Sequence, residues 1–245
     1  MRESGIWPAM ANFYQSVALD AWSDGHVPFG MSTNPALARS YSRLIVAHLR
    51  DLRDAGALDS SRPFLVLDLG SGSGRMTFHL ALALREASER LPWMPRVCVV
   101  LTDISQANLD ALKAHPQLAP LMAEGFVDAA WMDAVNPGGL TLQVSGQTIE
   151  EGTPLIAIAN YFFDTICQDA FMVYEGALKE ILVTVSVDDD TELDDPFLLA
   201  DAKLTYSSGP VRPQHYGEPV LDAVLDSYRG EPGKWAVSYT HLRAH

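Results

Sequence analysis

The sequence predicts an α/β fold built around a parallel, doubly wound sheet. Four short apolar runs, rich in β-branched and aliphatic residues, have the length of buried strands. A helical pattern follows each of the first two runs, and such alternation of strand and helix is typical of parallel sheets. Both of these runs end in an aspartate, and the first leads into a turn with three glycines. We therefore expect strands at 64–68, 96–102, 126–131 and 155–159.

The charge balance excludes some classes of partner. The chain of 245 residues carries 31 acidic and 17 basic side chains, which gives a net charge of −14. Binding that neutralises phosphates needs a basic face, so nucleic acid is not an expected partner. An acidic balance also disfavours anionic membrane surfaces. No secretory pattern opens the sequence and no apolar stretch approaches the roughly 20 residues that span a bilayer, so we predict a cytoplasmic protein without a membrane partner.

The chain has two cysteines, Cys98 and Cys167. Both fall at predicted strands or strand ends, which favours buried, inert thiols in a reducing compartment. Two cysteines are too few for a metal site of the cysteine type, and the acidic loop at 188–195 does not have EF-hand spacing. We predict no metal site.

Residues 1–58 are predicted to form a helical lid or packing layer ahead of the sheet. A rough apolar face indicates one helix over 10–22. Asn34 as N-cap and Pro35 at the first helical position open a second helix, which ends at Gly56.

The loop over 23–30 joins these two helices and carries His26 and Phe29. Long loops often contribute to function, so His26 could reach a substrate. The alternative is an ordinary solvated histidine, and the sequence leaves both open.

The turn after the first strand reads Asp68-Leu-Gly-Ser-Gly-Ser-Gly74-Arg75. Glycines let the backbone turn sharply and lie close to a ligand, because they have no Cβ. The dinucleotide fingerprint would need a glycine in place of Arg75, and a P-loop would need a lysine that the turn lacks. The spacing therefore excludes both of these phosphate-binding motifs.

The pattern Asp-x-Gly-x-Gly-x-Gly closely resembles the first motif of S-adenosylmethionine (SAM)-dependent methyltransferases with a Rossmann-like fold. The resemblance implies SAM as the cofactor, with its methionine end held by the acidic residue and the turn. The residues concerned are Asp68, Gly70, Ser71, Gly72 and Gly74. The alternative is a glycine-rich turn that serves only the close packing of strand and helix.

Acids at the ends of the next two strands extend this predicted cofactor site. Asp103 ends the second strand, where a carboxylate can accept hydrogen bonds from both ribose hydroxyls, and Ile104 beside it is included in the site. The alternative is a helix-capping aspartate, although Ser105 already provides the N-cap. Asp133 follows the third strand, where the methyltransferase pattern has an acid near the adenine. Aspartate is also common in turns at such positions.

The segment Asn160-Tyr-Phe-Phe-Asp164 follows the fourth strand, beyond which doubly wound sheets bind ligands. It shows some similarity to the Asn-Pro-Pro-Tyr motif of methyltransferases that act on exocyclic amines of bases, but both prolines are missing. It also resembles the Asn-Glu-Phe-Phe-Asp-Ala-Leu-Pro segment of MidA-type methyltransferases, the family of a mitochondrial complex I assembly factor that modifies arginine. Here Tyr161 replaces the glutamate, and Ala-Leu-Pro does not follow Asp164.

We predict that Asn160, Asp164 and Tyr161 border the point of methyl transfer and orient the acceptor or remove its proton. An arginine acceptor needs carboxylates to hold its guanidinium group. The tyrosine in place of glutamate therefore argues against arginine. The acceptor is left as an unidentified protein side chain or small molecule.

The rest of the chain predicts a hairpin inserted after the fourth strand, over 170–187, and a short helix over 219–228. Methyltransferases of this type have a seven-stranded sheet, and only four core strands precede the hairpin. We therefore expect an incomplete, C-terminally truncated SAM-binding domain over 59–235. The end of the chain, 236–245, fits no element of the fold and is predicted to be a non-native tail.

The resemblances imply SAM-dependent methyl transfer. A second hypothesis is a non-catalytic SAM-fold protein that acts in assembly or in binding a partner. A third is aminopropyl transfer as in polyamine synthases, which share the glycine turn, although their acidic segment after the fourth strand is not evident here. Transfer of label from SAM would distinguish these functions.

Overall fold

The structure is a computed structural model that describes residues 1–245 except 28–29, 32, 189–190, 230–236 and 240–245. The chain divides into two compact units. One comprises Tyr14–Phe162 and is called the parallel-sheet unit; the other comprises Met1–Phe13 with Phe163–His245 and is called the antiparallel unit. The segment boundaries expected at 58 and 235 stay a prediction.

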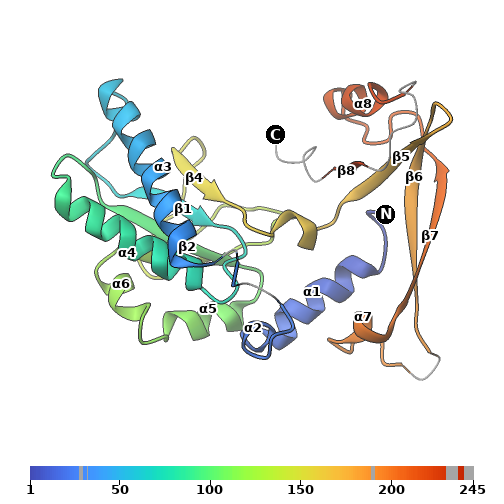
Figure 1. The fold of residues 1–245 in the computed structure, drawn as a ribbon, viewed down its shortest axis with the longest axis horizontal. Helices are drawn as coiled ribbons and strands as arrows, with labels where there is room; N and C mark the ends of the chain where they lie inside the picture. The colour runs from blue at the N-terminus through green and yellow to red at the C-terminus, as the bar shows by residue number, and fades with distance from the viewer. Residues whose placement is uncertain (28–29, 32, 189–190, 230–236, 240–245) are drawn as a thin grey trace. The chain divides into compact units, whose positions relative to one another are not determined.

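The parallel-sheet unit contains a four-stranded sheet in the order β3-β2-β1-β4 (Figure 1). All three pairings between neighbouring strands are parallel, as the sequence predicts. Three of the strands, β1, β2 and β3, are buried along most of their length, whereas β4, at the edge of the sheet, is buried only at Ile158. Their bounds are Phe64–Asp68 for β1, Val97–Asp103 for β2, Val127–Trp131 for β3 and Leu155–Ile158 for β4.

Five helices of the described chain belong wholly to this unit, and their caps follow the sequence signals. The side chain of Asn34 accepts a hydrogen bond from the backbone N–H of Leu37 at 2.9 Å and so caps α3. Ser105 caps α5 in the same way, through the N–H of Asn108. The helices are α2 (Asp20–Ser23), α3 (Pro35–Asp54), α4 (Arg75–Arg90), α5 (Gln106–Lys113) and α6 (Ala119–Ala123).

The single helix expected over 10–22 is wrong in detail. The structure has α1 (Ile6–Val17) and then the separate α2. Ala18 lies between them with a φ of 49°, in the left-handed region that a right-handed helix cannot contain. The apolar periodicity continues through this break, which is why the sequence did not reveal it.

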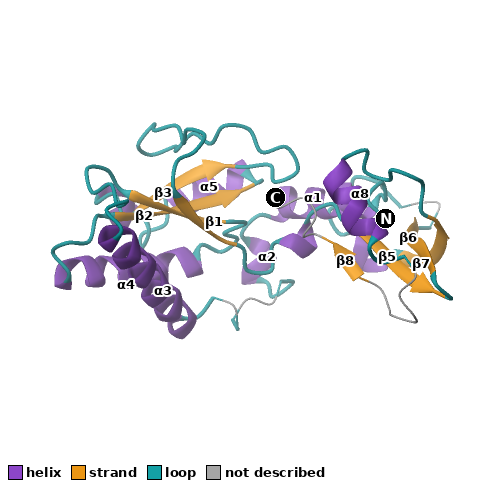
Figure 2. Cartoon of the chain, turned by 90° about the horizontal axis from the view of Figure 1, so that it is seen from above, coloured by secondary structure: helices purple, strands orange, loops and turns teal. Residues whose placement is uncertain are grey.

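The core of the parallel-sheet unit lies on both faces of the sheet. Alternate strand residues such as Val66 and Val99 face the larger cluster, to which α3, α4, α5 and α6 contribute; Figure 2 shows α3 and α4 on one side of β1, β2 and β3. The opposite face forms a smaller cluster of sheet residues with Leu142, covered by Leu140 and Ile149. Loop residues thus cover a face where a doubly wound sheet has helices.

Cys98 belongs to the smaller cluster and is buried within β2. Burial raises the pKa of its thiol to about 12, and the nearby carboxylate of Asp128 acts in the same direction. Cys167, in the antiparallel unit, is half-buried and is also a free thiol. The thiols match the expectation of unpaired cysteines, although only one is fully buried.

The antiparallel unit contains a second four-stranded sheet, in the order β7-β6-β5-β8. The predicted hairpin is confirmed: β5 (Asp169–Tyr174) and β6 (Ala177–Ser186) pair across a turn in which Glu175 and Gly176 have φ of 51° and 75°. A further strand, β7 (Lys203–Pro210), pairs with β6 and was not predicted from the sequence. The remaining elements are η1 (Phe163–Thr165), α7 (Leu198–Asp201), α8 (Pro219–Asp226) and β8 (Val237–Tyr239).

Two expectations fall partly outside the described residues. Phe29 of the loop over 23–30 lies outside them, whereas His26 is exposed. Of the expected tail over 236–245, three residues form β8 and pair with β5, and the others lie outside the described part of the chain. Among the described residues, no helix combines the length and the apolar character needed to cross a membrane.

Candidate functional site

The candidate site lies at the point where the strand order of the parallel sheet reverses. The chain moves from β1 to β2 and β3 on one side, then crosses to β4 on the other side of β1. In open α/β sheets, such a switch point at the carboxyl ends of the strands is where ligands bind. The glycine turn follows β1, and Asn160 follows β4, which is paired with β1 up to Ile158. The glycine turn and Asn160 therefore lie at the same edge of the sheet.

The side chain of Asp68, the last residue of β1, caps the amino end of α4. Its carboxylate accepts hydrogen bonds from the Thr77 hydroxyl, at 2.6 Å, and from the Thr77 backbone N–H. The residue at the N-cap of α4 is Gly74, which has no side chain, so the capping acceptor comes from the strand instead. Burial raises the pKa of Asp68 to about 6, against the effect of the two hydrogen bonds.

Ser71 ties the ends of β1 and β2 together. Its hydroxyl donates to the carbonyl of Asp68 at 2.9 Å and accepts from the N–H of Thr102 at 2.9 Å. Its own N–H donates to the carbonyl of Thr102 at 2.8 Å. These bonds fix the shape of the glycine turn, and the side chain of Ser71 is buried. Contact of Ser71 with a cofactor stays a prediction.

Asp103, at the end of β2, is 7% exposed and accepts bonds at both carboxylate oxygens. The Ser105 N–H donates to Oδ1 at 2.9 Å, and the Asn108 amide donates to Oδ2 at 2.7 Å. Burial raises the pKa of Asp103, whereas these bonds and one from the Gly72 N–H lower it. With the Ile104 N–H included, Asp103 accepts from four donors, so a ribose hydroxyl has to replace or share one of these bonds.

Asn108 is a site residue that the sequence analysis missed. Its amide group bridges the two predicted cofactor elements, since it donates to Asp103 and also to the carbonyl of Gly72, at 2.9 Å. Its Oδ1 is buried and has no hydrogen-bond partner within the described chain. A polar amide in the first turn of the helix after an acidic strand end is the sequence signal that could have identified it.

Ile104 follows β2 and Asp133 follows β3, at the carboxyl ends of these strands. Asp133 accepts from the N–H of Val135 at 2.9 Å, which is the turn chemistry that the sequence left open. The carbonyl of Ile104 accepts from the indole N–H of Trp131 at 2.8 Å, and Trp131 is 48% exposed. This exposed indole beside Ile104 was also missed. It offers a flat apolar surface next to the predicted adenine region.

The three glycines of the turn all have positive φ, at 61°, 53° and 67° for Gly70, Gly72 and Gly74. Neighbouring side chains lie so close that a Cβ would stand 2.7 Å from the ring of Phe162 at Gly70 and 2.6 Å from that of Trp22 at Gly72. At Gly74, it would stand 2.8 Å from Leu112. Glycine is therefore required here by both backbone conformation and space.

The residues after β4 present a polar and an aromatic group. The Tyr41 hydroxyl of α3 donates to Oδ1 of Asn160 at 2.7 Å, which orients the amide. Tyr161 is 74% exposed and has a φ of 48°, a conformation that is strained for a residue with a Cβ. Asp164 belongs to the antiparallel unit, at η1, and is exposed. A joint role for Asn160, Tyr161 and Asp164 stays a prediction.

Comparison with known proteins gives no match to a family model and none to a curated protein. One similar solved structure is described as a "COG1565 superfamily member and likely methyl transferase" from Burkholderia thailandensis, bound to S-adenosyl-homocysteine. It has 17% identity and a TM-score of 0.44, over 84% of this chain and 41% of that one. A second COG1565 superfamily protein from the same organism has 18% identity and a TM-score of 0.40, over 89% of this chain and 52% of that one. This chain thus spans only about half of the length of these proteins, 41% of the first and 52% of the second.

Proposed function

We propose that the parallel-sheet unit binds SAM at the glycine turn and that the protein is a SAM-dependent methyltransferase. The observation that carries this proposal is the meeting of the glycine turn with two buried carboxylates at the switch point of a parallel sheet. The spacing of Asp68 and the glycines, which resembles the first methyltransferase motif, supports the choice of SAM over a dinucleotide.

The donor and acceptor groups at this edge fit the parts of SAM. Asp68 and the glycine turn would hold the methionine end, where a carboxylate favours the positively charged amino group. Asp103 would accept from the ribose, with its carboxylate held in place by Ser105 and Asn108. The indole of Trp131 and the backbone at Ile104 would flank the adenine.

Bound SAM supplies a methyl group on a positively charged sulfur, so the protein needs mainly to position the acceptor. Asn160 would orient the acceptor, because the hydrogen bond from Tyr41 fixes the direction of its amide. Tyr161 would place an exposed ring beside it. The match of 160–164 to the MidA-type segment supports a relation to that family, and the replacement of its glutamate by Tyr161 favours an acceptor other than arginine.

Calorimetric titration of the full chain with SAM tests the cofactor assignment. The variant Asp103→Asn removes a charged acceptor and should weaken SAM binding by roughly 10- to 100-fold, the effect of a hydrogen bond to a charged group. The matched control is Asp110→Asn on α5, where the carboxylate is exposed and pairs with Lys113 at 2.9 Å. The proposal fails if the folded chain does not bind SAM, or if both variants bind it equally well.

A non-catalytic role has its own support. The carboxylates of Asp68 and Asp103 already accept internal hydrogen bonds, and the rings of Phe162 and Trp22 lie against Gly70 and Gly72. Incubation of the chain with labelled SAM and cell extract separates the two functions. Label found in a protein or a small molecule supports a methyltransferase, whereas SAM binding without transfer supports a binding or assembly protein.

A further inference from the structure

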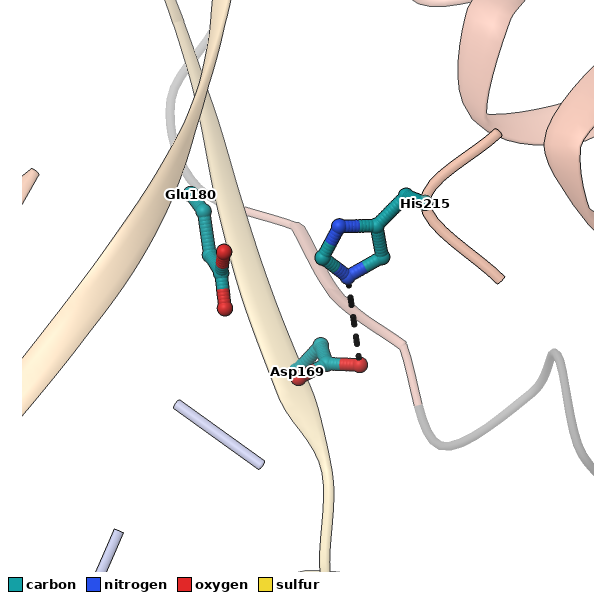
Figure 3. Close-up of side chains that lie close together, drawn as sticks. All are labelled: Asp169, Glu180 and His215. Atoms are coloured by element: carbon teal, nitrogen blue, oxygen red, sulfur yellow. Dashed lines mark ion pairs between the residues drawn. The ribbon is translucent and has the colours of Figure 1, made fainter. Parts of the chain in front are cut away.

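A second cluster of chemically active side chains lies in the antiparallel unit, at its sheet. Asp169 begins β5, Glu180 lies in β6, and His215 precedes α8. One ligand atom from each of the three lies within 4.8 Å of the others. Figure 3 shows the imidazole of His215 facing the two carboxylates. The cluster shares no residue with the proposed SAM site.

Strand pairing and aromatic packing bring the three groups together. Phe171 pairs with Glu180 across the two strands, so Asp169, two residues before Phe171, shares a sheet face with Glu180. The ring of His215 packs edge-on against Phe171, at 5.3 Å between centroids, and against Tyr216 at 4.8 Å. The fold therefore holds the imidazole over this face of the sheet.

The hydrogen-bonding capacity of the cluster is not fully used. Asp169 is 3% exposed, and the Nδ1 atom of His215 is buried without a hydrogen-bond partner in the described chain. The other ring nitrogen, Nε2, lies 3.8 Å from Oδ2 of Asp169, which is too far for a hydrogen bond. Buried polar atoms are costly when unpaired, so this arrangement favours a ligand that both residues can contact.

The two carboxylates already attract a cation. The terminal ammonium of Met1 lies 2.9 Å from Oε1 of Glu180 and 3.9 Å from Oδ1 of Asp169. The backbone N–H of Arg2 donates to the same Oδ1 at 3.0 Å. Oδ2 of Asp169 faces His215 instead. The cluster thus combines negative charge with an imidazole nitrogen, the donor set of a transition metal rather than of an ammonium group alone.

We propose that Asp169, Glu180 and His215 bind a divalent transition metal ion, with Zn²⁺ as the reference case. One imidazole nitrogen and two carboxylate oxygens suit Zn²⁺, whereas Mg²⁺ and Ca²⁺ prefer oxygen ligands only. In a tetrahedral zinc site, ligand atoms lie about 3.4 Å apart, so the cluster has to contract on binding. Glu180, whose side chain is 20% exposed, can move to achieve this. The bound ion would cross-link β5, β6 and the segment before α8.

This site could not be predicted from the sequence, because the three residues are far apart in the chain and follow no metal-binding spacing. They meet only through the pairing of β5 with β6 and the return of the chain after β7. The prediction that the chain lacks a metal site rested only on the cysteine count and on the acidic loop. It did not consider a site formed by one histidine and two carboxylates.

Titration of the full chain with Zn²⁺ in a calorimeter, and with Co²⁺ followed by visible absorption, tests the proposal. We expect one equivalent to bind and Co²⁺ to show the spectrum of a four-coordinate site. His215→Ala and Glu180→Gln should each weaken Zn²⁺ binding by more than the roughly 10- to 100-fold that loss of an outer-sphere partner costs. Because Glu180 is partly exposed, Glu180→Gln should remain folded even where His215→Ala does not, as circular dichroism can check.

The controls are His115→Ala and Glu192→Gln, which remove exposed groups of the same chemistry elsewhere in the chain. Acetylation of the terminal amine removes the competing ammonium and should leave Zn²⁺ binding unchanged or tighter. Failure to bind one equivalent, or equal binding by Glu180→Gln and Glu192→Gln, would overturn the proposal. Loss of thermal stability on acetylation without Zn²⁺ binding would identify the cluster as an anchor for the terminal ammonium instead.

Discussion

The two units of this protein bury carboxylates in different ways. In the parallel-sheet unit, Asp68 accepts hydrogen bonds only from neutral groups of Thr77, and Asp103 from neutral groups of Ser105, Asn108 and Gly72. In the antiparallel unit, Asp169 faces an ammonium group and an imidazole. The first arrangement leaves the negative charge unbalanced in the interior, whereas the second balances it with positive charge. Removal of a carboxylate should therefore have opposite effects in the two units.

The strands of the two units also differ in how far they are buried. Every residue of β1 and β2 is buried, whereas almost every residue of β7 is exposed. The parallel sheet is stabilised by apolar burial, at about 25 cal/mol for each Å² removed from water. The antiparallel unit has a smaller apolar cluster, formed by Phe171, Leu178, Val211 and Leu225. Variants that alter charge and space in each unit test this contrast.

Asp68→Asn should produce the largest change and should stabilise the protein. The folded pKa of Asp68, about 6, lies above its unfolded value of 3.8, so the folded state binds more protons between these values. Stability contributed by the protonated carboxyl is therefore lost as pH rises from about 4 to 6, by about 3 kcal/mol. Asparagine keeps an acceptor for Thr77 without the charge. Urea unfolding should show the variant more stable above pH 6, with the difference vanishing near pH 4.

The same variant should bind SAM less tightly, because the carboxylate that destabilises the fold is the one proposed to hold the amino group of SAM. Calorimetry at pH 7.5 measures this loss on the folded protein. A variant that is less stable than the wild type at pH 7.5, or whose stability difference does not depend on pH, would contradict the assignment of an unbalanced buried charge.

Gly72→Ala should destabilise the parallel-sheet unit by about 2–4 kcal/mol, because it adds both a strained positive φ and a contact of 2.6 Å with Trp22. The matched control is Gly146→Ala, at a φ of 74° with nothing within 4 Å of the added Cβ. It should cost only the backbone strain, about 1–2 kcal/mol. Unfolding monitored by tryptophan fluorescence gives both values. Equal losses would show that close packing on the turn is not important.

Glu180→Gln, measured with a chelator present, should destabilise the antiparallel unit by about 1 kcal/mol, since it removes the closest partner of the Met1 ammonium. The sign is opposite to that of Asp68→Asn. Added salt screens the ion pair, so the difference from wild type should shrink between 0.05 and 0.5 M NaCl, conditions chosen on the basis of the Debye length. A stabilising effect of the substitution would remove the contrast between the two units.

Tyr41→Phe should have the smallest effect on stability, about 1 kcal/mol or less, because it removes one hydrogen bond to Asn160. Its main effect should be on methyl transfer, through loss of the orientation of the Asn160 amide, with SAM affinity unchanged. Tyr206→Phe, at a ring that is 62% exposed, is the control. If the two variants transfer methyl groups at the same rate, Asn160 does not need Tyr41 for its role.

The parallel sheet could be predicted because its strands are continuous apolar runs and its helix starts carry capping signals such as Asn34. In contrast, β7 reads Lys-Leu-Thr-Tyr-Ser-Ser-Gly-Pro, in which only two apolar side chains alternate with polar ones before a run of turn residues. It becomes a strand because β6 offers a long edge for pairing. The break at Ala18 was also missed, because one residue of left-handed backbone leaves the apolar pattern intact.

The candidate site could be predicted only where a strand end determines its position. Asp68 and Asp103 fall at the edge of the sheet as soon as the strands are recognised. Trp22, Tyr41 and Trp131 could not be assigned in this way, because their places depend on how helices and loops pack over that edge. Their contacts are set by tertiary structure, which a single sequence does not encode in any local pattern.

The burial of Cys98 also makes the parallel-sheet unit accessible to a kinetic measurement. An alkylating reagent reacts with thiolate, and a thiol with a pKa of about 12 inside β2 offers neither thiolate nor access in the closed state. Half-buried Cys167 should therefore react first, and Cys98 only when the unit opens. The labelling rate of Cys98 reports how often this sheet opens in native buffer, and a ligand that binds the closed unit slows it in proportion to its occupancy.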